Sequence, residues 1–221
     1  MNFFGHAAVA AWARPATPAF ALGAMLPDFA AISGARSTRA VDDVTARGVS
    51  LHHATDEAFH SAADFVELMG SLRGRLEAVG LSRASAWASA HVAVELLLDG
   101  TLVADTRTGT LYLEALRNAR SHLACAAEEQ PLLDHFIDRM RDHGVPHGYA
   151  DPRFVATRVE RALARRPRLS LRPGQVDALG IALDDIAARV RARAPRLFAD
   201  VRRRLPPEAL CAPATSLPES G

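Results

Sequence analysis

Three residues with metal-binding side chains lie four positions apart, at His52, Asp56 and His60. On an α-helix, residues at this spacing share one face, with about 6 Å of rise between neighbours. Imidazole nitrogens and a carboxylate together suit zinc, manganese or iron, because the carboxylate offsets part of the charge of the ion. The spacing therefore predicts a helix that supplies ligands to a divalent metal ion. A polar helix face, or histidines that cap and pack, is the alternative interpretation.

A second run repeats this spacing, at His91, Glu95 and Asp99, in the most apolar segment of the chain. Charged groups on a helix that faces a core are costly unless they are paired or bind a metal. We predict that His91 is a further ligand, and that Glu95 or Asp99 orients the attacking water as a general base. The alternative is a solvated face, which the apolar neighbours at 92, 94, 96, 97 and 98 make narrow.

Further candidates lie outside these two runs. Asp28 stands in the apolar segment 22–29, where it is either a metal ligand or the cap of a helix that begins near Phe29. His6, beside two phenylalanines, has the same two interpretations, ligand or packed core residue. Three arginines in the polar stretch before the first histidine run are candidates for binding phosphate, since Arg forms bidentate contacts with it. They are Arg36, Arg39 and Arg47.

Helices must position these residues, because apolar residues recur at three- and four-residue spacing and alternating runs are nearly absent. The polar stretch 35–48 is expected to be an ordered loop with a short helix. The fold class predicted is all-α, a single-domain bundle of about seven helices over residues 1–205, followed by a disordered tail over 206–221. The helical segments are 3–13, 17–33, 49–70, 82–105, 110–142, 151–165 and 173–204.

The composition argues against a nucleic-acid-binding, membrane-spanning or disulfide-rich protein. The net charge is +1 over 221 residues, which gives no general attraction to nucleic acid or to a membrane surface. No stretch reaches the roughly 18 uncharged apolar residues that a membrane-spanning helix needs. The two cysteines, Cys125 and Cys211, lie far apart, so no disulfide framework is implied. We expect a cytoplasmic protein with no nucleic-acid partner and no membrane partner.

Taken in order, several segments resemble the acyl carrier protein phosphodiesterase family, a divergent relative of the His-Asp (HD-type) metal-dependent phosphohydrolases. Residues 1–6, Met-Asn-Phe-Phe-Gly-His, are similar to the family's Met-Asn-Phe-Leu-Ala-His start. Residues 22–29 are similar to its Gly-Asn-Leu-Leu-x-Asp-Phe segment. Residues 48–56 resemble its Gly-Ile-x-Leu-His-Arg-Arg-Ile-Asp. Residues 95–99 fall where the family carries an Asp and, four residues on, an Asp-His pair.

The resemblance implies an HD-like all-α fold and a divalent metal, manganese before zinc or iron. The implied reaction is hydrolysis of the phosphodiester that joins phosphopantetheine to a carrier-protein serine, with an acidic carrier protein as the partner. Carried over by position, Asp28, His52 and Asp56 would be metal-site residues, and Asp99 would be a ligand or base.

The chain departs from the family pattern at several positions. His53 and Ala54 replace two arginines, His60 and Glu95 replace aspartates, and Gly100 replaces a histidine. The chain still keeps a set of residues that can bind metal. Because the family positions are altered, a non-catalytic helical domain that retains the scaffold is a competing hypothesis. The spacing of His52, Asp56 and His60 also resembles that of zinc-dependent phospholipase C and related nucleases, which are all-α enzymes with clustered zinc ions.

Overall fold

The computed structural model describes residues 1–172 and 174–211, and within them almost every regular element is a helix. This confirms the predicted all-α class. Contacts divide the chain into two compact units. The division passes through α1 (Phe3–Ala10) after Gly5 and through α3 (Asp43–His60) after Thr55. Both units are helical.

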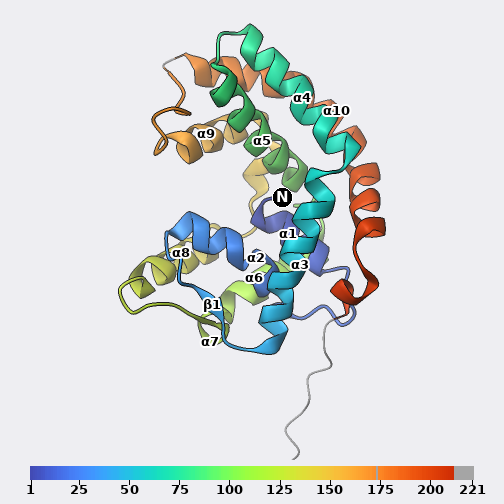
Figure 1. The fold of residues 1–221 in the computed structure, drawn as a ribbon, viewed down its shortest axis with the longest axis vertical. Helices are drawn as coiled ribbons and strands as arrows, with labels where there is room; N and C mark the ends of the chain where they lie inside the picture. Colours follow the sequence, from blue (N-terminus) through green and yellow to red (C-terminus); the bar gives the residue numbers. More distant parts are fainter. Residues whose placement is uncertain (173, 212–221) are drawn as a thin grey trace, which may run out of the picture. The chain divides into compact units, whose positions relative to one another are not determined.

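The first unit contains Met1–Gly5, Asp56–Thr106 and Val145–Arg204. Within it, α4 packs against α5 and α10, and α9 also packs against α5 and α10 (Figure 1). Leucines at four-residue spacing on α4, Leu68, Leu72 and Leu76, are fully buried in this packing. Besides the last turn of α3, the elements are α4 (Ala63–Ala78), α5 (Arg83–Gly100), the 3₁₀ helix η1 (His147–Ala150), α9 (Pro152–Leu163) and α10 (Gln175–Arg204).

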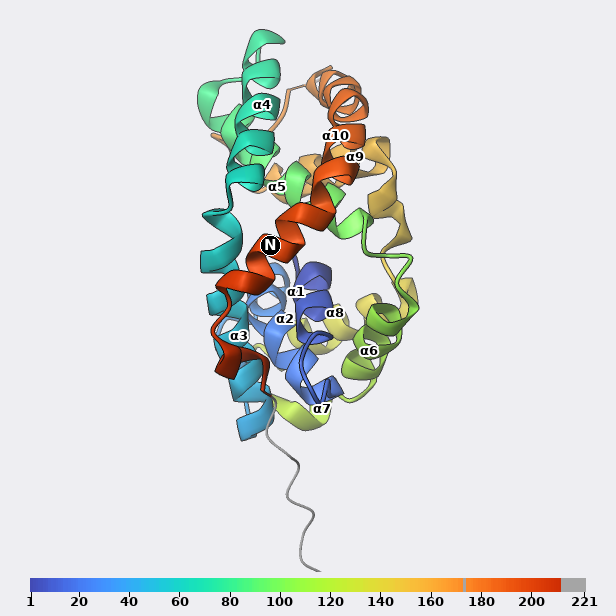
Figure 2. The ribbon, with the colours of Figure 1, turned by 90° about the vertical axis from the view of Figure 1, so that its right-hand side faces the viewer.

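The second unit contains His6–Thr55, Arg107–Gly144 and the chain from Leu205 onward. In it, α2 packs against α8 (Figure 2). The rings of Phe29 and Phe136 meet edge to face between these helices, with centroids 5.1 Å apart. Two short strands pair antiparallel, with Arg39 opposite Ala124. Its elements, after α1, are α2 (Pro18–Ser33), β1 (Arg39–Ala40), most of α3, α6 (Thr106–Arg117), α7 (Ala119–His122), β2 (Leu123–Ala124), α8 (Gln130–His143) and the 3₁₀ helix η2 (Pro207–Leu210).

Side-chain caps explain where several helices begin. The Thr17 hydroxyl accepts the amide of Phe20 at the start of α2, and the Ser82 hydroxyl accepts the amide of Ser85 at the start of α5. Asp42 accepts both the amide and the hydroxyl of Thr45 in the first turn of α3. Such caps satisfy backbone donors that have no partner inside the helix.

The helix boundaries differ from those predicted. The segment 49–70 is not one helix, because α3 ends at His60 and the extended backbone of Ala62 separates it from α4. The segment 110–142 divides into α6, α7, β2 and α8, so the described residues hold ten α-helices in place of seven. The stretch 35–48 contains β1 and the first turns of α3. The helix begins within this stretch because Asp42 caps it.

The interpretation of Asp28 as a helix cap is wrong. Asp28 lies inside α2, which runs from Pro18 to Ser33 straight through Pro27. A proline inside a helix removes one backbone hydrogen bond. Burial of its neighbours Leu26 and Phe29 supports the helix across this gap.

Two predictions concern the ends of the chain and membranes. Of the predicted tail, residues 207–210 form η2, and 212–221 lie outside the described residues. Among the residues that the structure describes, no helix combines the length and the apolar character needed to cross a bilayer.

Candidate metal centre

The last turn of α3 and the helix α5, both in the first unit, position the residues of the candidate centre. His60 is the last residue of α3, and His91 and Glu95 lie one turn apart on α5. On the face of α5 opposite His91 and Glu95, Ala93 and Leu97 are buried and hold the helix in the first unit. The candidate centre therefore combines one residue from the first predicted run with two from the second.

The two histidine side chains meet at one carboxylate oxygen of Glu95. Oε1 of Glu95 lies 3.0 Å from Nε2 of His60 and 3.0 Å from Nε2 of His91. The two imidazole rings stack, with centroids 5.0 Å apart and planes 27° apart. One ligand atom from each of the three residues lies within 4.8 Å of the other two, so the group could hold a metal ion.

The donor spacing fits a small divalent cation. Bonds of about 2.0–2.2 Å from nitrogen and oxygen to a tetrahedral ion place neighbouring ligand atoms about 3.3–3.5 Å apart. The two Nε2 to Oε1 distances of 3.0 Å need to open by only a few tenths of an ångström to meet that value. Two imidazoles with one carboxylate form a donor set that suits zinc, manganese or iron.

The amino group of Met1 lies beside this group. Its nitrogen is 2.8 Å from Oδ1 of Asp56 and 3.1 Å from Oε1 of Glu95. It also lies 3.5 Å from Nε2 of His60. Asp56, one turn before His60 on α3, is thereby tied to the centre, and about a third of its side chain is exposed.

Electrostatics keep Glu95 ionised although only 13% of its side chain is exposed. Burial acts to raise the pKa of Glu95, but hydrogen bonds from His60 and His91 and the positive charge of the Met1 amino group outweigh it. The pKa of Glu95 therefore lies well below its ordinary value. An ionised carboxylate is the form that binds a cation.

Asp99, the other predicted base, is completely buried one turn further along α5. Its Oδ2 accepts a hydrogen bond of 2.8 Å from the side-chain amide of Asn2. Burial raises the pKa of Asp99 well above its ordinary value, against smaller opposing effects from Asn2, the Met1 amino group and the Gly5 amide. The structure thus places Asp99 where it holds the N-terminal segment, away from any soluble substrate.

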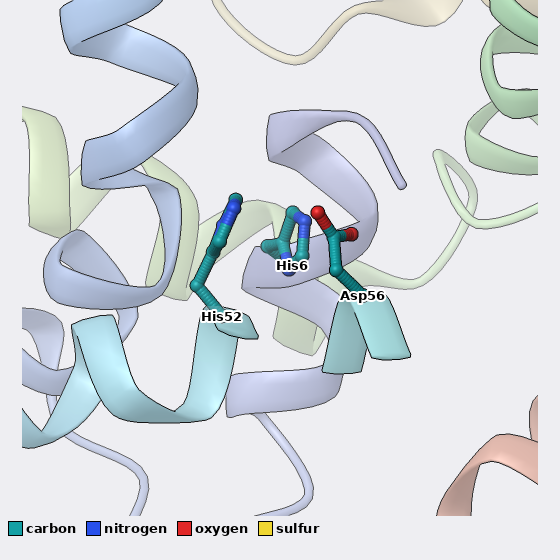
Figure 3. A group of neighbouring side chains, drawn as sticks. All are labelled: His6, His52 and Asp56. Atoms are coloured by element: carbon teal, nitrogen blue, oxygen red, sulfur yellow. The ribbon is translucent and has the colours of Figure 1, made fainter. Parts of the chain in front are cut away.

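Three further candidates belong to the second unit, namely the predicted ligands Asp28 and His52 and the residue His6. His52 is buried on α3, its Nδ1 lies 2.9 Å from the carbonyl oxygen of Ala24, and its ring stacks on that of His6 with centroids 3.9 Å apart. Figure 3 shows His52 and Asp56 on successive turns of α3, with His6 on α1. Asp28 also lies in the second unit, on α2.

The predicted phosphate-binding arginines, Arg36, Arg39 and Arg47, all lie in the second unit. The guanidinium of Arg47 donates to the carbonyl oxygen of Cys211, at 2.6 Å. Arg39 lies on β1. None of the three belongs to the unit that contains the candidate centre.

The fold explains why position 100 is occupied by a glycine. A Cβ atom on Gly100 would lie 2.2 Å from the carbonyl oxygen of Tyr149, because the backbone of η1 passes directly over the end of α5. A histidine, which the family pattern places here, does not fit at this position of the fold. Gly5 is similarly confined, since its Cβ would lie 2.6 Å from Oδ1 of Asp99.

Aromatic side chains that the sequence reasoning did not single out surround the two histidines. Phe65, in the first turn of α4, meets the rings of His60 and His91 edge on, with centroids 5.3 and 5.5 Å away. Trp87 lies over His91 with a centroid distance of 5.2 Å. The four-residue spacing from Trp87 to His91 could have identified the tryptophan, but no local pattern connects Phe65 or Met1 to this centre.

Comparison with protein-family models, with curated proteins and with solved structures finds no match to this chain.

Proposed function

We propose that this chain is a metal-dependent hydrolase of phosphoric esters, and that His60, His91 and Glu95 hold the ion. One observation carries the proposal, namely that three donors from two helices meet within 4.8 Å. The two histidine side chains are 34% and 25% exposed, so a substrate can reach them. A purely structural ion is commonly enclosed by protein ligands, whereas a catalytic ion keeps a position open.

When bound, a divalent ion lowers the pKa of a coordinated water toward about 7 and polarises a phosphoryl oxygen. The residues around it have separate tasks. Glu95 contributes negative charge, and the stack of His60 and His91 fixes the directions of their Nε2 atoms. Asp56 replaces Asp99 as the proposed general base, because its carboxylate is a third exposed while that of Asp99 is buried.

The identity of the metal and of the ester follows from the resemblance. Manganese is the proposed ion, with zinc and iron as alternatives that the same donors accept. A phosphodiester such as the phosphopantetheine linkage of an acidic carrier protein is the substrate that the resemblance implies. These finer assignments rest on the sequence motifs, and the donor geometry supports only the metal-binding part.

Hydrolysis of bis(4-nitrophenyl) phosphate by the purified full-length chain tests the proposal. Activity is expected with added manganese or zinc and is expected to disappear with a chelator. His60→Ala should lower kcat/KM by at least about a hundredfold, since losing even an indirect metal contact costs 10- to 100-fold. His135→Ala, which changes an exposed histidine on α8, is the matched control and should keep full activity. Equal activity in all three proteins, with and without chelator, would refute the proposal.

One contact favours a second candidate, a non-catalytic helical domain. The Met1 amino group lies within 3.1 Å of Asp56 and Glu95 and supplies positive charge where an ion would otherwise do so. In that case the purified chain carries no stoichiometric metal, and a chelator leaves both its thermal stability and its activity unchanged.

A further inference from the structure

Trp87 exposes 48% of its surface, although tryptophan is highly buried on average. It lies in the first turns of α5, one turn before His91, and its indole ring lies over the imidazole with an interplanar angle of 34°. An exposed aromatic surface of this kind is therefore placed directly beside the candidate metal centre.

Trp87 is one of several aromatic residues that lie around His60 and His91. Phe65 contacts both imidazole rings from α4, and Phe59 packs on Phe65 with centroids 4.4 Å apart. Phe59 and Phe65 are buried, so only Trp87 of these three aromatic residues presents a large surface to a ligand.

We propose that Trp87 is the stacking surface for a planar ring on the substrate, so that the preferred substrates are phosphoric esters of aromatic or heterocyclic groups, nucleotides above all, in place of the phosphopantetheine linkage, which carries no such ring. This inference rests on the proposed function. Trp87 and His91 are separated by one helical turn, about 6 Å of rise, so one small ester can place its phosphoryl group at the centre and its ring on the indole. Stacking on an aromatic side chain stabilises a bound base whatever its identity.

A structural role for Trp87 is the competing explanation. Among the described residues, Nδ1 of His91 is buried without a hydrogen-bond partner, so Trp87 and Phe65 help to orient its ring. Loss of that function would lower metal affinity. It would not change how strongly the protein prefers a ligand with a ring over one without a ring, and this difference separates the two roles.

Intrinsic fluorescence gives a direct readout, because the chain has only two tryptophans. In a Trp12→Phe background, emission reports Trp87 alone. Manganese content is measured first, and the metal-loaded protein is then titrated with adenosine 5′-monophosphate or with ribose 5-phosphate, which lacks the base. We expect the nucleotide to quench Trp87 and to bind about tenfold more tightly than ribose 5-phosphate.

Variants at position 87 complete the test, with affinities for both ligands measured by calorimetry. Trp87→Leu should bind the two ligands within about twofold of each other, and Trp87→Phe should restore most of the preference, since Phe retains a stacking surface. Ile181→Ala, at an exposed apolar residue of α10, is the matched control and should keep the preference of the wild type.

The outcomes separate the inference from the proposed function. Metal-loaded protein that binds both ligands equally, or neither, overturns the role of Trp87 and leaves the metal centre standing. Retention of the full preference in Trp87→Leu overturns it as well. Protein that binds no manganese or zinc refutes the proposed function and the inference with it.

Discussion

Replacement of Gly100 by alanine is expected to destabilise the first unit and to weaken its metal centre. The added Cβ would lie 2.2 and 2.5 Å from the carbonyl oxygen and carbon of Tyr149, which are backbone atoms that cannot rotate away. Contact distances for carbon are about 3.5 Å, so α5 and η1 must separate by about an ångström. Overpacking of this kind costs about 1–3 kcal/mol, and we expect about 2 after the gain in helix propensity.

Urea denaturation at pH 7 measures this effect, with Gly74→Ala as the control. Gly74 is an exposed residue inside α4 whose added Cβ would meet nothing within 4 Å. Alanine there should stabilise the protein by about 0.5–1 kcal/mol, so the two variants should move in opposite directions. Since α5 carries His91 and Glu95, Gly100→Ala should also lower manganese affinity. If both variants shift stability in the same direction, the close approach of η1 to α5 is wrong.

Three further predictions address electrostatics and metal binding. The pKa of Asp64 is lowered, chiefly by the hydrogen bonds from Arg196. The ionised carboxylate therefore stabilises the fold at pH values above the pKa of the unfolded chain, near 3.9, and this stabilisation is lost as the pH falls through the pKa of the folded protein. Asp64→Asn should therefore cost at most about 1 kcal/mol at pH 7, because Arg196 is exposed and water screens the pair, and it should flatten the acid limb of a stability-against-pH curve. The pKa of Asp99 is raised by burial, so stability decreases as pH rises above about 3.9, and Asp99→Asn should be more stable than wild type at pH 7 in thermal melts. A less stable variant would mean that Asp99 is ionised and paired. Manganese at about 100 times its Kd should stabilise the wild type by about 2.7 kcal/mol, and an unchanged melting temperature would count against binding.

Much of the helical framework could be predicted from the sequence because the apolar residues that the cores bury recur at helical spacing. The pairing of His91 with Glu95 was also predictable, since residues four apart on a helix share a face. The break at Ser61 and Ala62 was not, because neither residue is a strong helix breaker. The path of α2 through Pro27 depends on tertiary burial of Leu26 and Phe29, which local rules do not capture.

The composition of the candidate centre could be predicted only in part. His60, His91 and Glu95 meet because α3 ends where α5 passes, and this is a long-range contact that no spacing reveals. The positions of the Met1 amino group and of Phe65 depend on the same packing. Asp99 has the spacing expected of a base, but its complete burial and its bond to Asn2 become visible only in the fold.

Metal stoichiometry tests the central claim most directly. Purified wild-type chain, Glu95→Gln and the exposed control Glu57→Gln are dialysed against manganese or zinc, and bound metal is measured by elemental analysis. The donor set formed by His60, His91 and Glu95 predicts about one ion per chain in the wild type and in Glu57→Gln, and little in Glu95→Gln, which keeps the shape of the side chain but loses its charge. Equal metal content in all three proteins, or none in the wild type, would contradict a metal centre at these residues.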